Sequence, residues 1–160
     1  MKTLRTKAIV LRRTNYGESD RIVQLLTPEY GKMSVLARGI RRERSKLAGG
    51  IELFSRSDIT VAAGKGEMGI LTGARAEVFY RNILTDYDRL QFGYEVLKQI
   101  TKATEMLDEP AFFELCDQSL AALNDAELDL ALVRAWFWLQ LATLLGNGVN
   151  LASDNNGMKL

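Results

Sequence analysis

The spacing of hydrophobic residues divides this 160-residue chain into two parts. Up to residue 80, short runs of apolar and β-branched residues alternate with turn-like segments, a pattern typical of β-strands. From residue 84 onward, apolar residues recur every three or four positions, as they do on one face of a helix. The sequence therefore predicts two domains, over residues 1–80 and 84–160.

The first part predicts five short strands, over residues 7–13, 21–27, 32–38, 51–63 and 67–79. Turns of a few residues join them, except for a longer glycine-containing loop after the third strand. Gly69 and Gly73, inside the fifth strand, permit the sharp coiling that a small barrel needs. Short strands connected in this way favour an all-β barrel of the OB-fold type.

The second part predicts an all-α domain of three helices. Thr85 and Asp88 resemble a capping box at the start of the first helix. Asp108 followed by Pro110 marks the start of the second helix, because aspartate caps well and proline suits the first turn. Cys116 lies on the apolar face of this second helix, where we expect it to fill the core.

The third predicted helix, residues 127–145, is apolar almost all round. A helix of that kind needs to be buried by neighbours on several sides. Trp136 and Trp138 are too close in sequence to share one helix face. One of them is expected to face the helical bundle, and the other to face the barrel, a further segment or a partner.

Charge is distributed unequally between the two parts. Residues 1–80 hold 15 Lys and Arg against 8 Asp and Glu, a net charge of +7. Residues 81–160 hold 6 against 12, a net charge of −6, so the total is only +1. A near-neutral total therefore conceals a basic barrel joined to an acidic helical domain, and does not argue against nucleic acid.

Missing residue types narrow the function. The chain has no His and one Cys, so it has no Ser-His-Asp or Cys-His pair and no zinc site of the usual Cys/His type. We therefore expect a protein that is not an enzyme, with no catalytic residues, metal or cofactor. The apolar runs are too short for a signal peptide or a membrane span, and a single cysteine is compatible with the reducing cytoplasm, where we expect the protein.

The strongest local feature is residues 38–46, RGIRRERSK, with five basic residues and one acidic residue in nine positions. It falls in a predicted loop between strands, and loops of OB-type barrels bind single strands. Arginine also offers forked donors that match phosphate oxygens. The alternative is a merely solubilising loop.

The predicted DNA-binding residues are Arg38, Arg41, Arg42, Arg44 and Lys46, with Arg12, Arg13 and Arg21 as further cations and Tyr16 to stack on bases. Phe54 could also stack, but a place in the barrel core is favoured for so large an apolar residue.

The order and spacing of several short motifs over about 50 residues resemble the RecO family of bacterial recombination-mediator and repair proteins. The motifs are Ile9-Val10-Leu11, Tyr16-Gly17-Glu18-Ser19-Asp20, Thr27, Gly31-Lys32, Ala37-Arg38-Gly39, Arg41-Arg42 and Ser45. The similarity continues more weakly through the helices to residues 144–146. Family members usually continue well beyond that point, many with a four-cysteine zinc module, so this chain is expected to be a cut or naturally short member.

The resemblance implies an OB-fold followed by a helical domain, and a protein that binds single- and double-stranded DNA and anneals complementary strands. It implies a RecR partner, and that the two together displace single-strand-binding protein and help to load RecA recombinase. The basic OB face of the family would correspond to Arg38, Arg41, Arg42, Arg44 and Lys46. The helical domain is similar to the part of the family that docks the acidic tail of single-strand-binding protein.

Two other functions remain open at this stage. One is a protein-interaction module that acts through the acidic helical domain, suggested by the apolar helix with two tryptophans. The other is an RNA-binding OB-fold protein, which differs from the first interpretation only in its nucleic acid.

Overall fold

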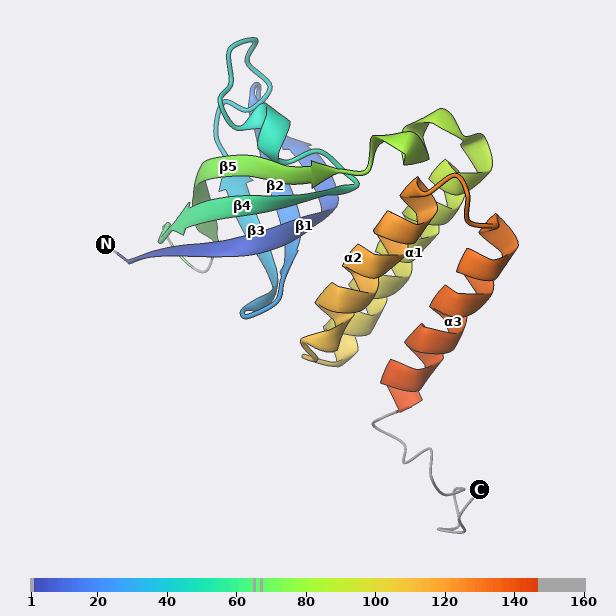
Figure 1. The fold of residues 1–160 in the computed structure, drawn as a ribbon. Helices are drawn as coiled ribbons and strands as arrows, with labels where there is room; N and C mark the ends of the chain where they lie inside the picture. Colours follow the sequence, from blue (N-terminus) through green and yellow to red (C-terminus); the bar gives the residue numbers. More distant parts are fainter. Residues whose placement is uncertain (1, 65, 67, 147–160) are drawn as a thin grey trace.

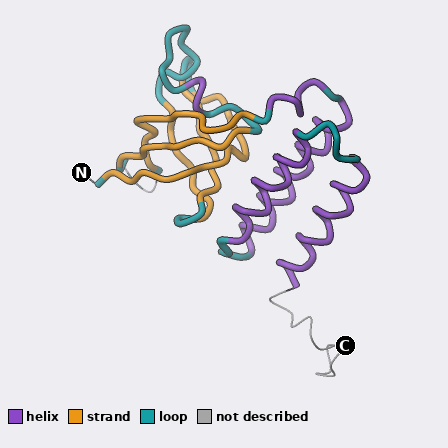
Figure 2. The backbone as a smooth tube through the Cα atoms, viewed as in Figure 1, coloured by secondary structure: helices purple, strands orange, loops and turns teal. Residues whose placement is uncertain are grey.

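The computed structural model describes residues 2–64, 66 and 68–146. In that part of the chain, a closed five-stranded barrel is followed by three α-helices, which confirms the predicted fold class (Figure 1). The elements are β1 (Thr3–Tyr16), β2 (Asp20–Thr27), β3 (Gly31–Ala37), β4 (Ser55–Ala62), β5 (Gly69–Phe79), α1 (Tyr87–Met106), α2 (Ala111–Asn124) and α3 (Leu130–Gly146), with short 3-10 helices at Ala48–Gly50 and Arg81–Thr85. Strands and helices occupy separate halves of the molecule (Figure 2).

The barrel closes in the order β1-β2-β3-β5-β4, with β4 pairing back onto β1. The long strand β1 therefore pairs on both sides: Ile9 is opposite Leu26 of β2 and Arg56 of β4. The only parallel pairing among these strands joins β3 to β5, at Val35 and Gly69. Full closure leaves no open sheet edge between these strands.

A β-bulge in β1 lies where the strand changes from apolar to basic. Its register with β2 shifts between Val10 and Arg12. Before the bulge, Val10 belongs to the core inside the barrel, whereas Ile9 and Leu11 belong to a second core outside it. Beyond the bulge the strand continues with Arg12 and Arg13, so it brings two cations directly past its buried stretch.

The predicted fourth strand begins later than the sequence indicates. Residues 51–54 follow a 3-10 helix and form no strand, and Phe54 has a positive φ of 63°. The reason is tertiary: Ile51 is buried in the barrel core, and the fully buried Phe54 ring packs in the second core. The backbone oxygen of Phe54 also accepts a hydrogen bond from Tyr80 N at 2.9 Å. Phe54 is thus buried, as favoured from its size, but in the second core rather than in the barrel core that the sequence predicted.

Two helix starts differ from the predicted caps. Asp86, not Thr85, caps α1, because its carboxylate accepts hydrogen bonds from Asp88 N at 3.0 Å and Arg89 N at 3.2 Å. Thr85 instead closes the preceding 3-10 turn. At α2 the capping position is Pro110, which makes no side-chain cap.

The apolar third helix starts at Leu130, three residues later than predicted, after Asp129 accepts a hydrogen bond from Ala131 N at 3.0 Å. Trp136 packs against the core shared by the helices, and Trp138, 41% exposed, also contacts that core through the rings of Phe92 and Phe137. The expectation that one tryptophan faces away from the bundle was therefore wrong within the described residues. Much of α3 remains uncovered within the described residues: Leu132 is 70% exposed and Leu139 65%.

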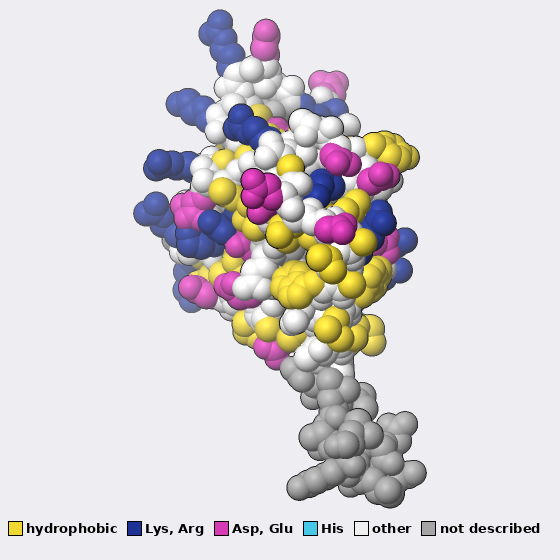
Figure 3. Space-filling view, turned by 45° about the vertical axis from the view of Figure 1, so that its right-hand side comes forward, with side chains coloured by type: hydrophobic (Ala, Val, Ile, Leu, Met, Phe, Trp, Pro, Cys, Tyr) yellow, Lys and Arg dark blue, Asp and Glu magenta, His cyan; other side chains and the backbone are white. Residues whose placement is uncertain are grey.

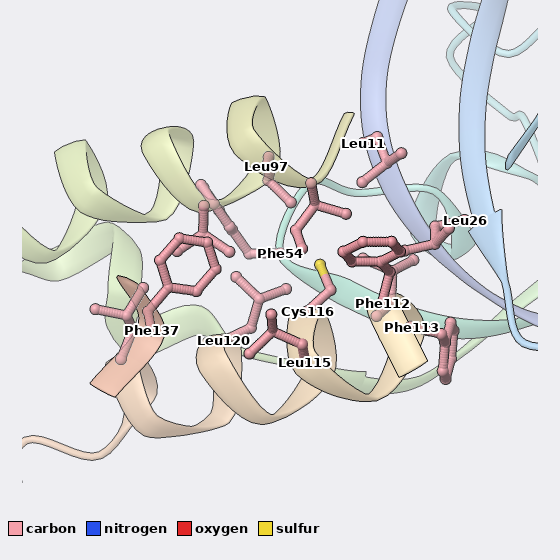
Figure 4. Close-up of a cluster of buried hydrophobic side chains, with 14 of the residues drawn as sticks. Leu11, Leu26, Phe54, Leu97, Phe112, Phe113, Leu115, Cys116, Leu120 and Phe137 are labelled. Atoms are coloured by element: carbon pink, nitrogen blue, oxygen red, sulfur yellow. The ribbon is translucent and has the colours of Figure 1, made fainter. Parts of the chain in front are cut away.

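The second hydrophobic core lies between the barrel and the helices (Figure 4). Leu11, Leu26 and Phe54 from the barrel side meet Phe112 and Cys116 of α2. Cys116 is fully buried, as expected of a core cysteine, and burial raises the pKa of its thiol. Burying side chains of this size contributes about 1.5–3 kcal/mol each, so the barrel and helices stabilise one another.

Polar contacts fix how the helices sit on the barrel. Asp117 of α2 accepts hydrogen bonds from Arg56 of β4 and from Tyr80 Oη, the latter at 2.7 Å. Burial, followed by this hydrogen bond, raises the pKa of Tyr80. At the other end of the contact, Lys32 of β3 reaches α1, donating to Thr101 O at 3.2 Å and pairing with Glu105 at 3.3 Å.

Among the described residues, none of the helices combines the length and the apolar character needed to cross a bilayer. The expected cytoplasmic location stays a prediction.

Candidate nucleic-acid interface

The basic loop projects from one end of the barrel, between β3 and the 3-10 helix Ala48–Gly50 (Figure 1). It is tied at its base to the turn between β1 and β2. Asp20 accepts a hydrogen bond from Gly39 N at 2.7 Å, and Arg41 N donates to Ser19 O at 2.9 Å. Gly39 adopts a positive φ of 65°, which glycine tolerates without strain. Hydrogen bonds to the barrel therefore fix the position of the base of the loop.

The loop cations differ in what they contact. Arg38, Arg42, Arg44 and Lys46 are exposed and make no ion pair within the described part of the chain. Arg41 is half-buried, and its guanidinium donates to Gly17 O at 2.5 Å. Four of the five predicted loop cations are thus available to a ligand, while Arg41 has a clear structural role.

Arg13, Arg21 and Arg41 come together below the loop, at the same end of the barrel. Arg21 donates to Asn15 Oδ1 at 3.1 Å, and Arg13 pairs with Glu52 at 3.3 Å. Burial lowers the pKa of Arg21, and the neighbouring charges of Arg13 and Arg41 lower it further, while the charge of Glu52 acts in the opposite direction. Arginine remains charged despite such a shift, so a bound anion would relieve repulsion here.

Arg12 and Tyr16 lie on either side of this cluster along β1. Tyr16 is 55% exposed at the last position of the strand, one residue before the Gly17 that Arg41 contacts. Its ring is therefore available for stacking beside the loop. Arg12 is exposed and faces a groove next to α1, away from the loop. The structure thus places the loop cations near the β1–β2 turn and the end of β1 that carries Tyr16, and places Arg12 at the groove beside α1.

Basic and hydrophobic side chains gather on different parts of the surface (Figure 3). Lys and Arg side chains project from the barrel part, whereas hydrophobic side chains gather over the helical part in this view (Figure 3). Within the described residues, no three His, Cys, Asp or Glu side chains are grouped so that they could hold a metal ion. The site offers cations and aromatic rings, which suit binding to a polyanion.

Sequence reasoning missed two cations that lie near this surface. Lys98 and Lys102 of α1 line the groove beside Arg12. A signal existed, because Lys98 and Lys102 are four residues apart and so share one helix face. Only the packing of α1 against β1 reveals that this face meets the basic strand.

Three known proteins that are similar to this chain carry the same name. The "DNA repair protein RecO" of Roseiflexus sp. (strain RS-1) is 35% identical over 133 residues, covering 82% of this chain and 46% of the relative. That of Rubrobacter xylanophilus is 32% identical over 146 residues, 91% of this chain and 58% of the relative. The family described as "Recombination protein O N terminal" matches residues 1–79. The chain belongs to the RecO family.

The RecO family model matches the barrel, and the matches to individual RecO relatives extend over the helices as well. The "DNA repair protein RecO" of Alkaliphilus metalliredigens (strain QYMF) is 29% identical over 151 residues, or 94% of this chain and 61% of the relative. The chain therefore spans about half to three fifths of the length of these RecO relatives.

Proposed function

We propose that this chain binds DNA through the basic end of its barrel and acts in DNA repair and recombination. The carrying observation is the group of exposed, unpaired loop cations, Arg38, Arg42, Arg44 and Lys46, held in place by the β1–β2 turn. The relatives named DNA repair protein RecO support the choice of DNA.

The proposed activity is annealing of complementary single strands. Lysine and arginine contact phosphates without reading the bases, so such a surface accepts any sequence. Each neutralised phosphate releases counterions and lowers the repulsion between two strands. Tyr16 adds a stacking platform at the edge of the loop, while most base edges stay free to pair with a second strand. No bond is made or broken, so the proposal needs no catalytic residue and no cofactor.

The proposal extends to double-stranded DNA and to protein partners through the family resemblance. With a RecR partner, the chain would help to load RecA recombinase onto single strands coated with single-strand-binding protein, whose acidic tail would dock on the helical domain. An RNA-binding role uses the same surface, and competition between DNA and RNA strands of one sequence separates the two.

A protein-interaction module is the second candidate, and the uncovered side of α3 favours it. This helix has a single charged residue, Arg134, and exposes Leu132 and Leu139. Exposed apolar surface of this kind is typical of a protein contact. Absence of any DNA binding at low salt, with tight binding to a protein partner, would favour this candidate over the first.

A strand-annealing assay tests the proposal. Two complementary labelled oligonucleotides are mixed at two salt concentrations, with and without single-strand-binding protein. The wild-type chain should speed annealing, most strongly at low salt, because phosphate contacts weaken as salt rises. The loop variant Arg38→Gln/Arg42→Gln/Arg44→Gln should lose most of that acceleration.

The matched control is Arg5→Gln/Arg75→Gln/Arg134→Gln, which removes the same charge from exposed positions elsewhere. It should anneal strands nearly as fast as the wild type. Equal rates for the loop variant and this control would refute the site. Annealing of bare strands but not of coated strands would refute the loading role alone.

A further inference from the structure

Helix α1 crosses β1 and leaves a groove of about 400 Å³ between them, called here the β1–α1 groove. It is lined by Leu11, Arg12, Arg13 and Leu53 from the barrel side and by Tyr94, Leu97, Lys98, Thr101 and Lys102 from α1. Its floor is apolar, because Leu11 and Leu97 are buried in the core shared by barrel and helices. Its rim is basic on both walls.

Three of the four groove cations have no acidic partner among the described residues. Arg12, Lys98 and Lys102 are exposed and form no ion pair in the described residues, while Arg13 has one partner, Glu52. Like charges four residues apart, such as Lys98 and Lys102, repel one another and destabilise a helix slightly. The arrangement therefore costs some helix stability and leaves a positive groove open to solvent.

This placement is unexpected in an acidic helical part. Lys98 and Lys102 are the only lysines between residue 81 and residue 146, and both lie on the face of α1 toward β1. Arg89, by contrast, is buried and donates to backbone oxygens such as that of Leu123, at 2.9 Å. The helical part thus directs its two lysines toward the basic strand of the barrel.

An aromatic ring stands in the same groove. Tyr94 is 46% exposed, one helical turn before Lys98. Its ring is held against Phe54, with 5.4 Å between ring centroids. A ring fixed on one side and open on the other is a suitable surface on which a nucleobase can stack.

The groove also continues the surface at the barrel end. Arg13 lines the groove and lies opposite Val23 of β2, two residues from Arg21. Arg41 of the loop contacts Gly17, just beyond the end of β1. We propose that the β1–α1 groove is a second binding segment for single-stranded nucleic acid, in which Lys98, Lys102 and Arg12 hold phosphates and Tyr94 stacks a base. The strand would run from the loop, over the barrel end, into the groove. This inference rests on the proposed function.

A long ligand suits this surface better than a short acidic peptide. A peptide would need only the groove cations, whereas a long strand would also reach Arg21 and the loop cations at the barrel end. Only a polymer with evenly spaced phosphates uses both ends at once. The inference therefore predicts that the groove matters for long strands and not for short ones.

Fluorescence anisotropy with labelled oligothymidylates of about 8 and about 30 nucleotides tests this, since one OB-fold covers about 4–16 nucleotides. The variant Lys98→Gln/Lys102→Gln should bind the long strand about tenfold more weakly at low salt, with the slope of log K against log salt reduced by about 1.4. The short strand should bind as to the wild type. The control Arg81→Gln/Arg134→Gln removes the same charge from the helical part away from the groove.

Equal long-strand binding by Lys98→Gln/Lys102→Gln and the control would overturn the proposed role of the groove in binding. The variant Arg38→Gln/Arg42→Gln/Arg44→Gln would still test the role of the loop cations. Absence of DNA binding by the wild type would overturn the proposed function as well. A polyglutamate peptide serves as a separate probe: loss of peptide binding alone in Lys98→Gln/Lys102→Gln would make the groove a peptide site and refute the inference. Arg12→Gln, on the other wall, should show the same length-dependent loss without altering α1.

Discussion

Asp20 shows how one carboxylate can serve a basic site. It lies at the first position of β2 and accepts hydrogen bonds from Gly39 N and, at 3.4 Å, from Ser19 Oγ. An acid beside arginines would ordinarily be expected to oppose a polyanion. Here its role is to hold the start of the basic loop against the β1–β2 turn, so that the exposed cations keep fixed positions.

Asp20→Ala should therefore lower the free energy of unfolding by about 1–3 kcal/mol, because a half-buried backbone donor loses its partner. Urea unfolding at neutral pH measures this. Asp20→Asn keeps an acceptor oxygen and should lose less. A stability of Asp20→Ala equal to that of the wild type would show that the hydrogen bond to Gly39 does not hold the loop.

The sequence predicts the loop cations but not their separate roles. Five basic residues in nine positions indicate a polyanion site, and the sequence alone does not distinguish their roles. The structure separates Arg41, which contacts Gly17 O, from its exposed neighbours such as Arg42. That difference depends on how the β1–β2 turn lies against the loop, a contact between residues more than 20 positions apart.

Among the elements, an ion network links three strands to a helix. Glu77 of β5 accepts from Lys7 of β1 and, at 2.9 Å, from Arg56 of β4, and Arg56 also contacts Asp117 of α2. Hydrogen bonds from Lys7 and then Arg56 hold the pKa of Glu77 below its ordinary value of 4.5. The network connects the barrel to α2, whereas Lys32 connects it to α1.

This shift gives a stability that depends on pH. A carboxyl with a lower pKa in the folded chain contributes fully above its unfolded value of 4.5, and loses that contribution as pH falls through the folded pKa. The wild type should therefore lose more stability than Glu77→Gln between about pH 6 and about pH 3. Urea unfolding across this range compares them, and parallel pH profiles would contradict the assigned network.

Elements defined by local pattern were predictable, and those set by distant contacts were not. The strand predicted at residues 21–27 matches β2 within one residue, since its apolar and β-branched run is bounded by turns. The predicted strand from residue 51 was wrong over its first four residues, because Phe54 is drawn into the core with the helices. The β1–α1 groove likewise depends on tertiary packing that no local pattern records.

At the scale of the whole molecule, the two parts differ in charge but share a hydrophobic core. Phe112 and Cys116 of α2 close over Leu11 and Leu26 of the barrel, so the helices are fixed to the barrel (Figure 4). A basic barrel rigidly joined to an acidic helical part orients any bound strand. The two lysines of α1 extend the basic surface onto the helices only because this shared core fixes α1 beside β1.

The central claim is that the exposed loop cations bind phosphates of a single strand. The most direct measurement is the salt dependence of binding to a labelled oligothymidylate by the wild type, the variant Arg38→Gln/Arg42→Gln/Arg44→Gln and the control Arg5→Gln/Arg75→Gln/Arg134→Gln. The slope of log K against log salt should fall by about 2 in the loop variant, about 0.7 per lost contact, and should change little in the control. Equal slopes for the loop variant and the wild type would contradict it.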